Sequence, residues 1–181
     1  MNRTKIIASG IIMATVAAVI QGIPAFLSEA FALLTLASAI PVYTAARSNP
    51  LSGVISYVAA FLLLLFIDPG EGVNFLLTNG VVGLAQGLTV HFNLKNVLAL
   101  AISSAALTVT SAIMNFGLDI PVLGVTLPGS GFVQLLFMLI IAVGYNFGFR
   151  ILADFVYQKL QNAGIASKSE DESKKSDENN S

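Results

Sequence analysis

Five polar or acidic side chains lie within long apolar stretches of this sequence: Glu29, Asn74, Asn79, Asn115 and Gln134. Amide groups carry both hydrogen-bond donors and acceptors, and a carboxylate adds acceptors. Gathered at one level of a helical bundle, such groups form a pocket that recognises the donors and acceptors of a polar solute. We therefore predict that these five residues bind a small solute.

The residues available for catalysis point away from an enzyme. The sequence has no cysteine, which excludes disulfides, thiolate metal sites and cysteine nucleophiles. Its one histidine, His91, has no neighbouring carboxylate and is a poor metal ligand, so we expect an interfacial residue there. We expect Gly129-Ser130-Gly131 on the opposite side of the membrane from His91, which excludes a Ser–His dyad, and no phosphate-binding loop is present. We predict no catalytic residue, no metal and no cofactor.

The elements that must position these residues follow from composition and charge. Hydrophobic residues make up 55% of the 181 residues and charged residues only 10%, against about 25% in soluble domains. Between Ile6 and Phe149 the few charges alternate in sign along the chain, and they fall in gaps between apolar runs: Glu29, Arg47, Asp68 with Glu71, Lys95, Asp119. Basic residues bracket this stretch, and bases favour the cytoplasmic side. The pattern predicts a multi-pass protein of the cell membrane with both termini cytoplasmic. The sequence has no basic stripe, so nothing in it indicates a nucleic-acid partner.

A membrane-spanning helix needs about 20 mostly apolar residues. On that basis the sequence predicts an all-α integral membrane protein, a six-transmembrane-helix bundle over residues 1–160, with these spans: 5–24, 26–46, 50–67, 72–91, 96–117 and 131–150. The last helix continues to about residue 160, where Arg150 and Asp154 form a favourable pair four residues apart. Residues 161–181 are polar and charged, which predicts a disordered cytoplasmic tail.

Three parts of this organisation have alternatives or irregularities. Pro41 is expected to kink or end the second span near its inner end. The fourth span, 72–91, is rich in amides and glycines, so a broken or re-entrant segment is the alternative to a full helix there. The first apolar stretch resembles a signal peptide cleaved after Ala25, an alternative that leaves the remaining topology unchanged.

Topology determines where the polar residues lie. If the first span runs outward, Glu29, Asn74, Asn79, Asn115 and Gln134 all fall in the outer half, beneath a long outer loop at 117–131. Outer loops often carry function. The alternative is that these amides only form hydrogen bonds between helices. Asp68, Glu71 and Asp119 are expected to be solvated turn and loop residues.

Small residues define two faces for close helix packing. On the first span, Gly10, Ala14 and Ala18 recur every four residues and continue to Gly22. This strip predicts docking onto another helix, either of the same chain or of a separate subunit. Gly80, Gly83 and Gly87 mark a second face, expected to be internal.

Over roughly residues 5–160 the chain resembles the S components of energy-coupling factor (ECF) transporters, small six-helix membrane proteins with both ends cytoplasmic. The motif that carries the resemblance is alanine-x-x-x-alanine on the first helix, here Ala14 and Ala18, extended by Gly10. The stretch from Pro41 to Gly87 is also similar to uncharacterised bacterial membrane proteins related to S components.

The resemblance implies a substrate-binding subunit of a vitamin-type transporter. Its first helix would dock onto a transmembrane scaffold subunit driven by a pair of ATPases, and its small-molecule substrate would lie under the outer loops. The alternative function is a membrane scaffold or accessory protein that binds other membrane proteins through small-residue faces and carries no solute.

Overall fold

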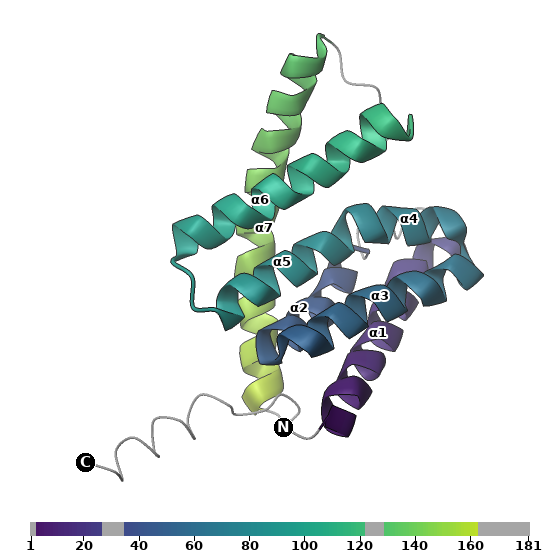
Figure 1. Ribbon diagram of the computed structural model, residues 1–181, viewed down its shortest axis with the longest axis vertical. Coiled ribbons are helices and arrows are strands. Elements are labelled where there is room, and N and C mark those ends of the chain that lie inside the picture. Colours follow the sequence, from purple (N-terminus) through teal and green to yellow (C-terminus); the bar gives the residue numbers. More distant parts are fainter. Residues whose placement is uncertain (1–2, 27–34, 122–128, 163–181) are drawn as a thin grey trace.

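The computed structural model describes residues 3–26, 35–121 and 129–162, and within these ranges every regular element is helical. The elements follow in order along the chain (Figure 1): α1 Arg3–Phe26, α2 Ala39–Ser48, α3 Pro50–Ile67, α4 Pro69–Leu77, α5 Asn79–His91, α6 Asn96–Ala112, the π-helical turn η2 Ile113–Gly117, and α7 Gly131–Asn162. The all-α prediction is confirmed.

Within the described residues, the helices that are long and apolar enough to cross a membrane are five: Arg3–Pro24, Pro50–Ile67, Pro69–His91, Asn96–Gly117 and Gly131–Asn162. They support a membrane-embedded protein and correspond to the first, third, fourth, fifth and sixth predicted spans. Of the second predicted span, 26–46, the structure describes helical backbone only from residue 35 onward, a 3₁₀ turn at 35–38 followed by α2, because residues 27–34 lie outside the described part. A sixth span therefore stays a prediction.

Two tight turns use the same local device. Asn49 precedes Pro50, and its side-chain oxygen accepts hydrogen bonds from the backbone N–H groups of Leu51 and Ser52, at 3.0 and 3.2 Å. Asp68 precedes Pro69 and accepts in the same way from Gly70 and Glu71. An Asn or Asp cap followed by proline at the first helical position starts a helix sharply. These caps explain why the predicted bounds 50–67 agree with those of α3.

The fourth predicted span is broken, in agreement with the alternative prediction. The backbone leaves helical geometry at Thr78 (φ −127°, ψ −90°), which separates α4 from α5. A break inside a membrane frees backbone carbonyls, which need other partners. Here the Thr78 hydroxyl donates to the Asn74 carbonyl, and the Tyr57 hydroxyl donates to the Leu76 carbonyl at 2.7 Å.

The centre of the molecule is α2, whose residues from Pro41 to Ala46 are all buried. It packs closely on α5 because glycines of α5 leave room for its backbone. A Cβ at Gly83 would collide with the Ala39 carbonyl oxygen, and a Cβ at Gly87 would lie 2.7 Å from the Tyr43 carbonyl oxygen. The prediction of an internal glycine face on the fourth span is thus confirmed. Pro41 does not end the second span, because α2 continues beyond it to Ser48. It lies in the first turn of α2, directly after a 3₁₀ turn at 35–38, and the kink that was the other expectation stays a prediction.

The small-residue strip of α1 packs inside the chain. Gly10 contacts α3, where a Cβ would lie 2.9 Å from the Ser52 carbonyl oxygen, and Ala14 and Ala18 are buried. Of the two partners considered for this strip, a helix of the same chain is the one observed. The docking role predicted for Gly10, Ala14 and Ala18 toward a separate subunit finds no free surface here.

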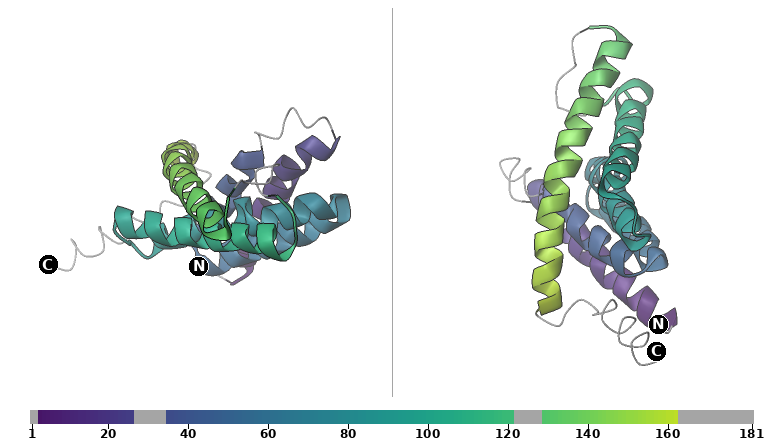
Figure 2. Two further views of the ribbon diagram at one scale, coloured as in Figure 1. Left: turned by 90° about the horizontal axis from the view of Figure 1, so that it is seen from above. Right: turned by 90° about the vertical axis from the view of Figure 1, so that its left-hand side faces the viewer.

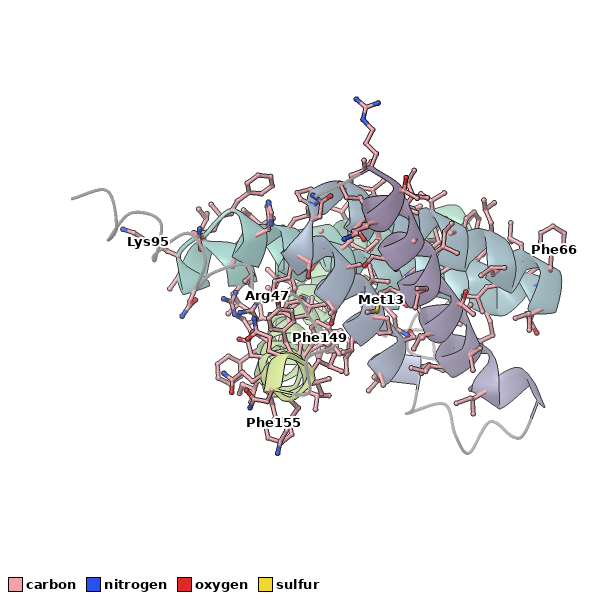
Figure 3. The ribbon with its side chains drawn as sticks, turned by 90° about the horizontal axis from the view of Figure 1, so that it is seen from below. Met13, Arg47, Phe66, Lys95, Phe149 and Phe155 are labelled. Atoms are coloured by element: carbon pink, nitrogen blue, oxygen red, sulfur yellow. The ribbon has the colours of Figure 1, made fainter. Side chains whose placement is uncertain are left out.

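The last two helices project beyond the others. In Figure 1, α6 and the first half of α7 rise above α2–α5, and in the right-hand view of Figure 2 they run side by side. The start of α1 and the last turns of α7 lie at the same end of the molecule (Figure 2). We call this end the basic end, because it holds three basic residues: Arg47 in the last turn of α2, Lys95 just before α6, and Arg150 of α7, whose side chain donates to Asn96. Figure 3 shows Arg47 and Lys95 on one side and Phe66, which is 91% exposed, at the opposite edge.

Candidate functional site

A cavity of about 240 Å³ lies where the break between α4 and α5 faces α6 and α7. Its walls come from four parts of the chain: the segment before α2, the break itself, the end of α6 and the middle of α7. The lining residues are Thr35, Leu36, Asn74, Thr78, Asn79, Leu107, Ser111, Met138, Ile141, Ala142 and Tyr145. The broken span thus supplies the polar wall of the cavity.

Asn79, the first residue of α5, holds three of these parts together. Its amide nitrogen donates to the Gln21 side-chain oxygen at 3.0 Å and to the Thr35 carbonyl at 3.1 Å. Its amide oxygen accepts from the Tyr145 hydroxyl at 3.1 Å. Both amide hydrogens and one acceptor position are therefore used within the protein. Asn79 fixes the cavity wall and contributes little free hydrogen-bonding capacity.

Behind Asn79 lies a buried polar network that sequence reasoning missed. Gln21 of α1 is fully buried, accepts from the Ser38 hydroxyl at 2.7 Å and donates to the Glu71 carboxylate at 2.7 Å. Glu71 is thus a half-buried partner of Gln21, and its prediction as a solvated turn residue is wrong. The available signal was a glutamine inside the apolar first span, since buried polar groups need partners.

Two side chains in the cavity retain unused donors. Ser111 is only 5% exposed, and its hydroxyl makes no hydrogen bond with any described residue. Asn74 accepts from the Thr78 hydroxyl at 3.2 Å through its amide oxygen, and its amide nitrogen has no partner among the described residues. The described polar atoms that are fully buried without a partner belong to other residues: Ser52, Ser56, Gln86, Ser103 and Arg150. Ser111 and Asn74 instead line open space, where their unused groups are available to a ligand.

The five predicted solute ligands separate in the structure. Asn74 and Asn79 line the cavity. Asn115 and Gln134 are absent from its lining: the Asn115 amide donates to the Gln134 side-chain oxygen at 3.4 Å, and Gln134 also donates to the Gly129 carbonyl. Glu29 lies outside the described residues. Solute binding by these residues stays a prediction.

A second buried polar group lies below the cavity. The Gln86 amide donates to the Asn146 side-chain oxygen at 3.1 Å, and the Asn146 amide donates to the Ala142 carbonyl at 2.8 Å. Both side chains are fully buried, and the Gln86 amide oxygen has no partner among the described residues. This pair attaches α7 to α5 beside Tyr145.

At the basic end, charged and aromatic side chains attach α7 to α2. Asp154 contacts the Arg47 guanidinium at 2.7 Å and accepts from the Tyr43 hydroxyl, while Arg47 lies over the Tyr157 ring at 3.9 Å. Burial lowers the pKa of Arg47, but the neighbouring Tyr43 and Asp154 outweigh it and leave that pKa raised. Arg150 lies 3.9 Å from Asp154, which confirms the predicted pair. Figure 3 shows Arg47 beside α7 viewed end-on.

A further small-residue face remains open. Gly144 and Gly148 lie four residues apart on α7, and a Cβ added at either would meet no heavy atom within 4 Å among the described residues. The sequence Gly-Tyr-Asn-Phe-Gly is a Gly-x-x-x-Gly spacing of the kind that lets membrane helices approach closely. That spacing was the signal available from the sequence.

Comparisons with known proteins give no match to any family model, curated protein or solved structure. Within the described ranges no group of three or more His, Cys, Asp or Glu side chains is arranged to hold a metal ion.

Proposed function

We propose that this chain is the membrane-embedded solute-binding subunit of a transporter, similar in role to an ECF S component. It captures a small solute from outside the cell and relies on a partner module, a transmembrane scaffold with paired ATPases, for energy. The observation that carries the proposal is the cavity at the helix break, where Ser111 and Asn74 keep unused hydrogen-bonding groups. Broken helices line the substrate sites of many membrane transporters.

The proposed orientation rests on charge. Arg47 and Arg150 stand at the basic end, and Asp68 and Glu71 flank the turn between α3 and α4. Because bases favour the cytoplasmic side, we infer that both termini lie inside and that the cavity, at the α4–α5 break, lies in the outer half. The described lining of the cavity has no charged side chain. We infer that binding occurs in this chain and that the partner supplies the energy for transport.

A docking partner needs an open face for close helix approach. The α1 strip is already occupied by α3, which moves the proposed scaffold contact to Gly144 and Gly148 on α7. Replacing Gly144 with leucine should reduce co-purification with a scaffold subunit, whereas Val143→Leu, at a neighbouring exposed position, should not. Equal co-purification of the two variants would remove this contact from the proposal.

One observation favours the alternative function, a scaffold or accessory protein without a solute. Asn115 and Gln134 bond to each other, as that alternative predicts for outer polar residues. The two functions differ in whether the cavity is occupied.

Solute retained by protein purified in mild detergent tests the proposal, with released small molecules identified by mass spectrometry. Ser111→Leu fills the cavity, and Val109→Leu changes a 59% exposed position on the same helix. We expect a retained solute in the wild type and in Val109→Leu, and none in Ser111→Leu. Absence of any solute from the wild type, or equal retention by Ser111→Leu, would favour the accessory role.

A further inference from the structure

We infer that the solute of this cavity is a small, uncharged molecule with an apolar body and one polar edge that carries both an acceptor and a donor. This inference rests on the proposed function and specifies its solute class. It is drawn from three properties of the cavity: its size, its unused hydrogen-bonding groups and the absence of charge among its described lining residues.

The size limits the solute to a small molecule. A volume of about 240 Å³ is below the range of about 300–1,000 Å³ typical of drug-sized ligands. A single ring with one polar substituent fits that space, whereas a large multi-ring cofactor does not.

The unused groups define the polar edge of the solute. Asn74 offers its amide N–H groups, and the Ser111 hydroxyl can donate or accept. The Tyr145 hydroxyl donates to the Asn79 side chain, and the Thr78 hydroxyl donates to the Asn74 carbonyl. Toward the cavity each of these hydroxyls therefore retains only acceptor capacity. A solute that presents both an acceptor and a donor satisfies this set.

The rest of the lining defines the apolar body. Leu107 of α6 and Met138, Ile141 and Ala142 of α7 form the wall opposite the α4–α5 break. A buried charge is very unfavourable unless it is paired, and none of the described lining residues is charged. Glu71, the acid in the network behind Asn79, bonds to Gln21 and does not line the cavity. The cavity therefore selects against ionised solutes.

Three compounds of one shape test the charge selection directly: benzamide, which is neutral, benzoate, which is anionic, and benzamidine, which is cationic at pH 7. Ligand-observed NMR titration of the purified protein in detergent measures their dissociation constants. We expect benzamide to bind at least ten-fold more tightly than either charged isostere. Binding of benzoate or benzamidine as tightly as benzamide would overturn the inferred class while leaving solute binding intact.

Matched variants assign the binding to this cavity. Ser111→Ala removes the unpaired hydroxyl and should weaken benzamide binding roughly three- to ten-fold, the effect of one neutral hydrogen bond. Thr110→Val is the control, because the Thr110 hydroxyl already bonds to carbonyls of its own helix and lies outside the cavity lining. Equal affinities in Ser111→Ala and the wild type would exclude this site.

Failure to bind any of the three compounds would also overturn the inferred class. Mass spectrometry of solute retained by the wild-type protein then separates the solute class from the proposed function. A retained charged solute would leave the proposed function standing without the class, and no retained solute would remove both.

Discussion

The cavity and the basic end both place polar groups inside an apolar helical bundle, but they differ in how completely those groups are paired. At the basic end Arg47, Asp154 and Tyr43 bond to one another and join α2 to α7, and the one buried atom there without a described partner is a guanidinium nitrogen of Arg150. In the cavity Asn79 is fully engaged, while Ser111 and Asn74 keep groups without a partner among the described residues. A mutually satisfied cluster holds helices together, and an incompletely satisfied one beside open space is suited to a ligand.

This difference separates stability from binding. Changes at the basic end should lower the stability of the fold and leave solute affinity nearly unchanged. Changes at Ser111 should weaken solute binding and leave the stability of the fold nearly unchanged. Asn79 belongs to both categories, because it fixes the cavity wall through bonds to other helices.

The largest expected effect is on stability, from Asp154→Leu. This change removes the anion that faces Arg47 and leaves the half-buried guanidinium without its partner. Loss of charged hydrogen bonds of this kind lowers the free energy of unfolding by about 1.5–3 kcal/mol. Thermal denaturation in detergent measures the change, and Lys159→Met, at a cation that stands over the Phe155 ring on the same helix, is the control. A loss no larger than that of the control would show that the cluster does not fasten α7.

The next effect comes from Asn79→Leu, which leaves Gln21 and Tyr145 without hydrogen-bond partners they now have. We expect about 1–3 kcal/mol of destabilisation, together with loss of solute binding. Thr15→Val is a suitable control, because the Thr15 hydroxyl bonds only to its own helix at the exposed surface. Unchanged solute affinity in Asn79→Leu would place the solute elsewhere.

The smallest expected effect on stability is that of Ser111→Ala. Because the hydroxyl has no partner among the described residues, its removal should change the free energy of unfolding by no more than about 0.5 kcal/mol. The same thermal denaturation measures it. A loss above about 1 kcal/mol would mean that the hydroxyl already has a structural partner, and the contrast between the two regions would fail.

Local signals in the sequence predicted much of the fold. Asn49-Pro50 and Asp68-Pro69 determine where α3 and α4 begin through side-chain caps, which depend on adjacent residues only. The Arg150–Asp154 pair follows from helical spacing. Features that depend on tertiary contacts were not predictable in this way.

Two examples show why. The small strip at Gly10 is compatible with any close-packing helix, and only the assembled bundle selects α3. Gln21 and Glu71 are fifty residues apart in the sequence, and their bond exists because α1 passes the start of α4. At the candidate site, the amides Asn74 and Asn79 stood out by type in an apolar span, whereas Ser111 is one of several serines and threonines in α6 and is distinguished only by the cavity it faces.

The proposal that the cavity opens to the outside of the cell is tested most directly by thiol labelling. The sequence has no cysteine, so a cysteine introduced by a single substitution is the one thiol in it, and no native cysteine has to be removed first. Asn74→Cys introduces a thiol in the cavity, and His91→Cys introduces one at the basic end. A membrane-impermeant maleimide applied to intact cells should label Asn74→Cys and not His91→Cys, with both labelled after the membrane is opened. Labelling of His91→Cys but not Asn74→Cys in intact cells would contradict the account.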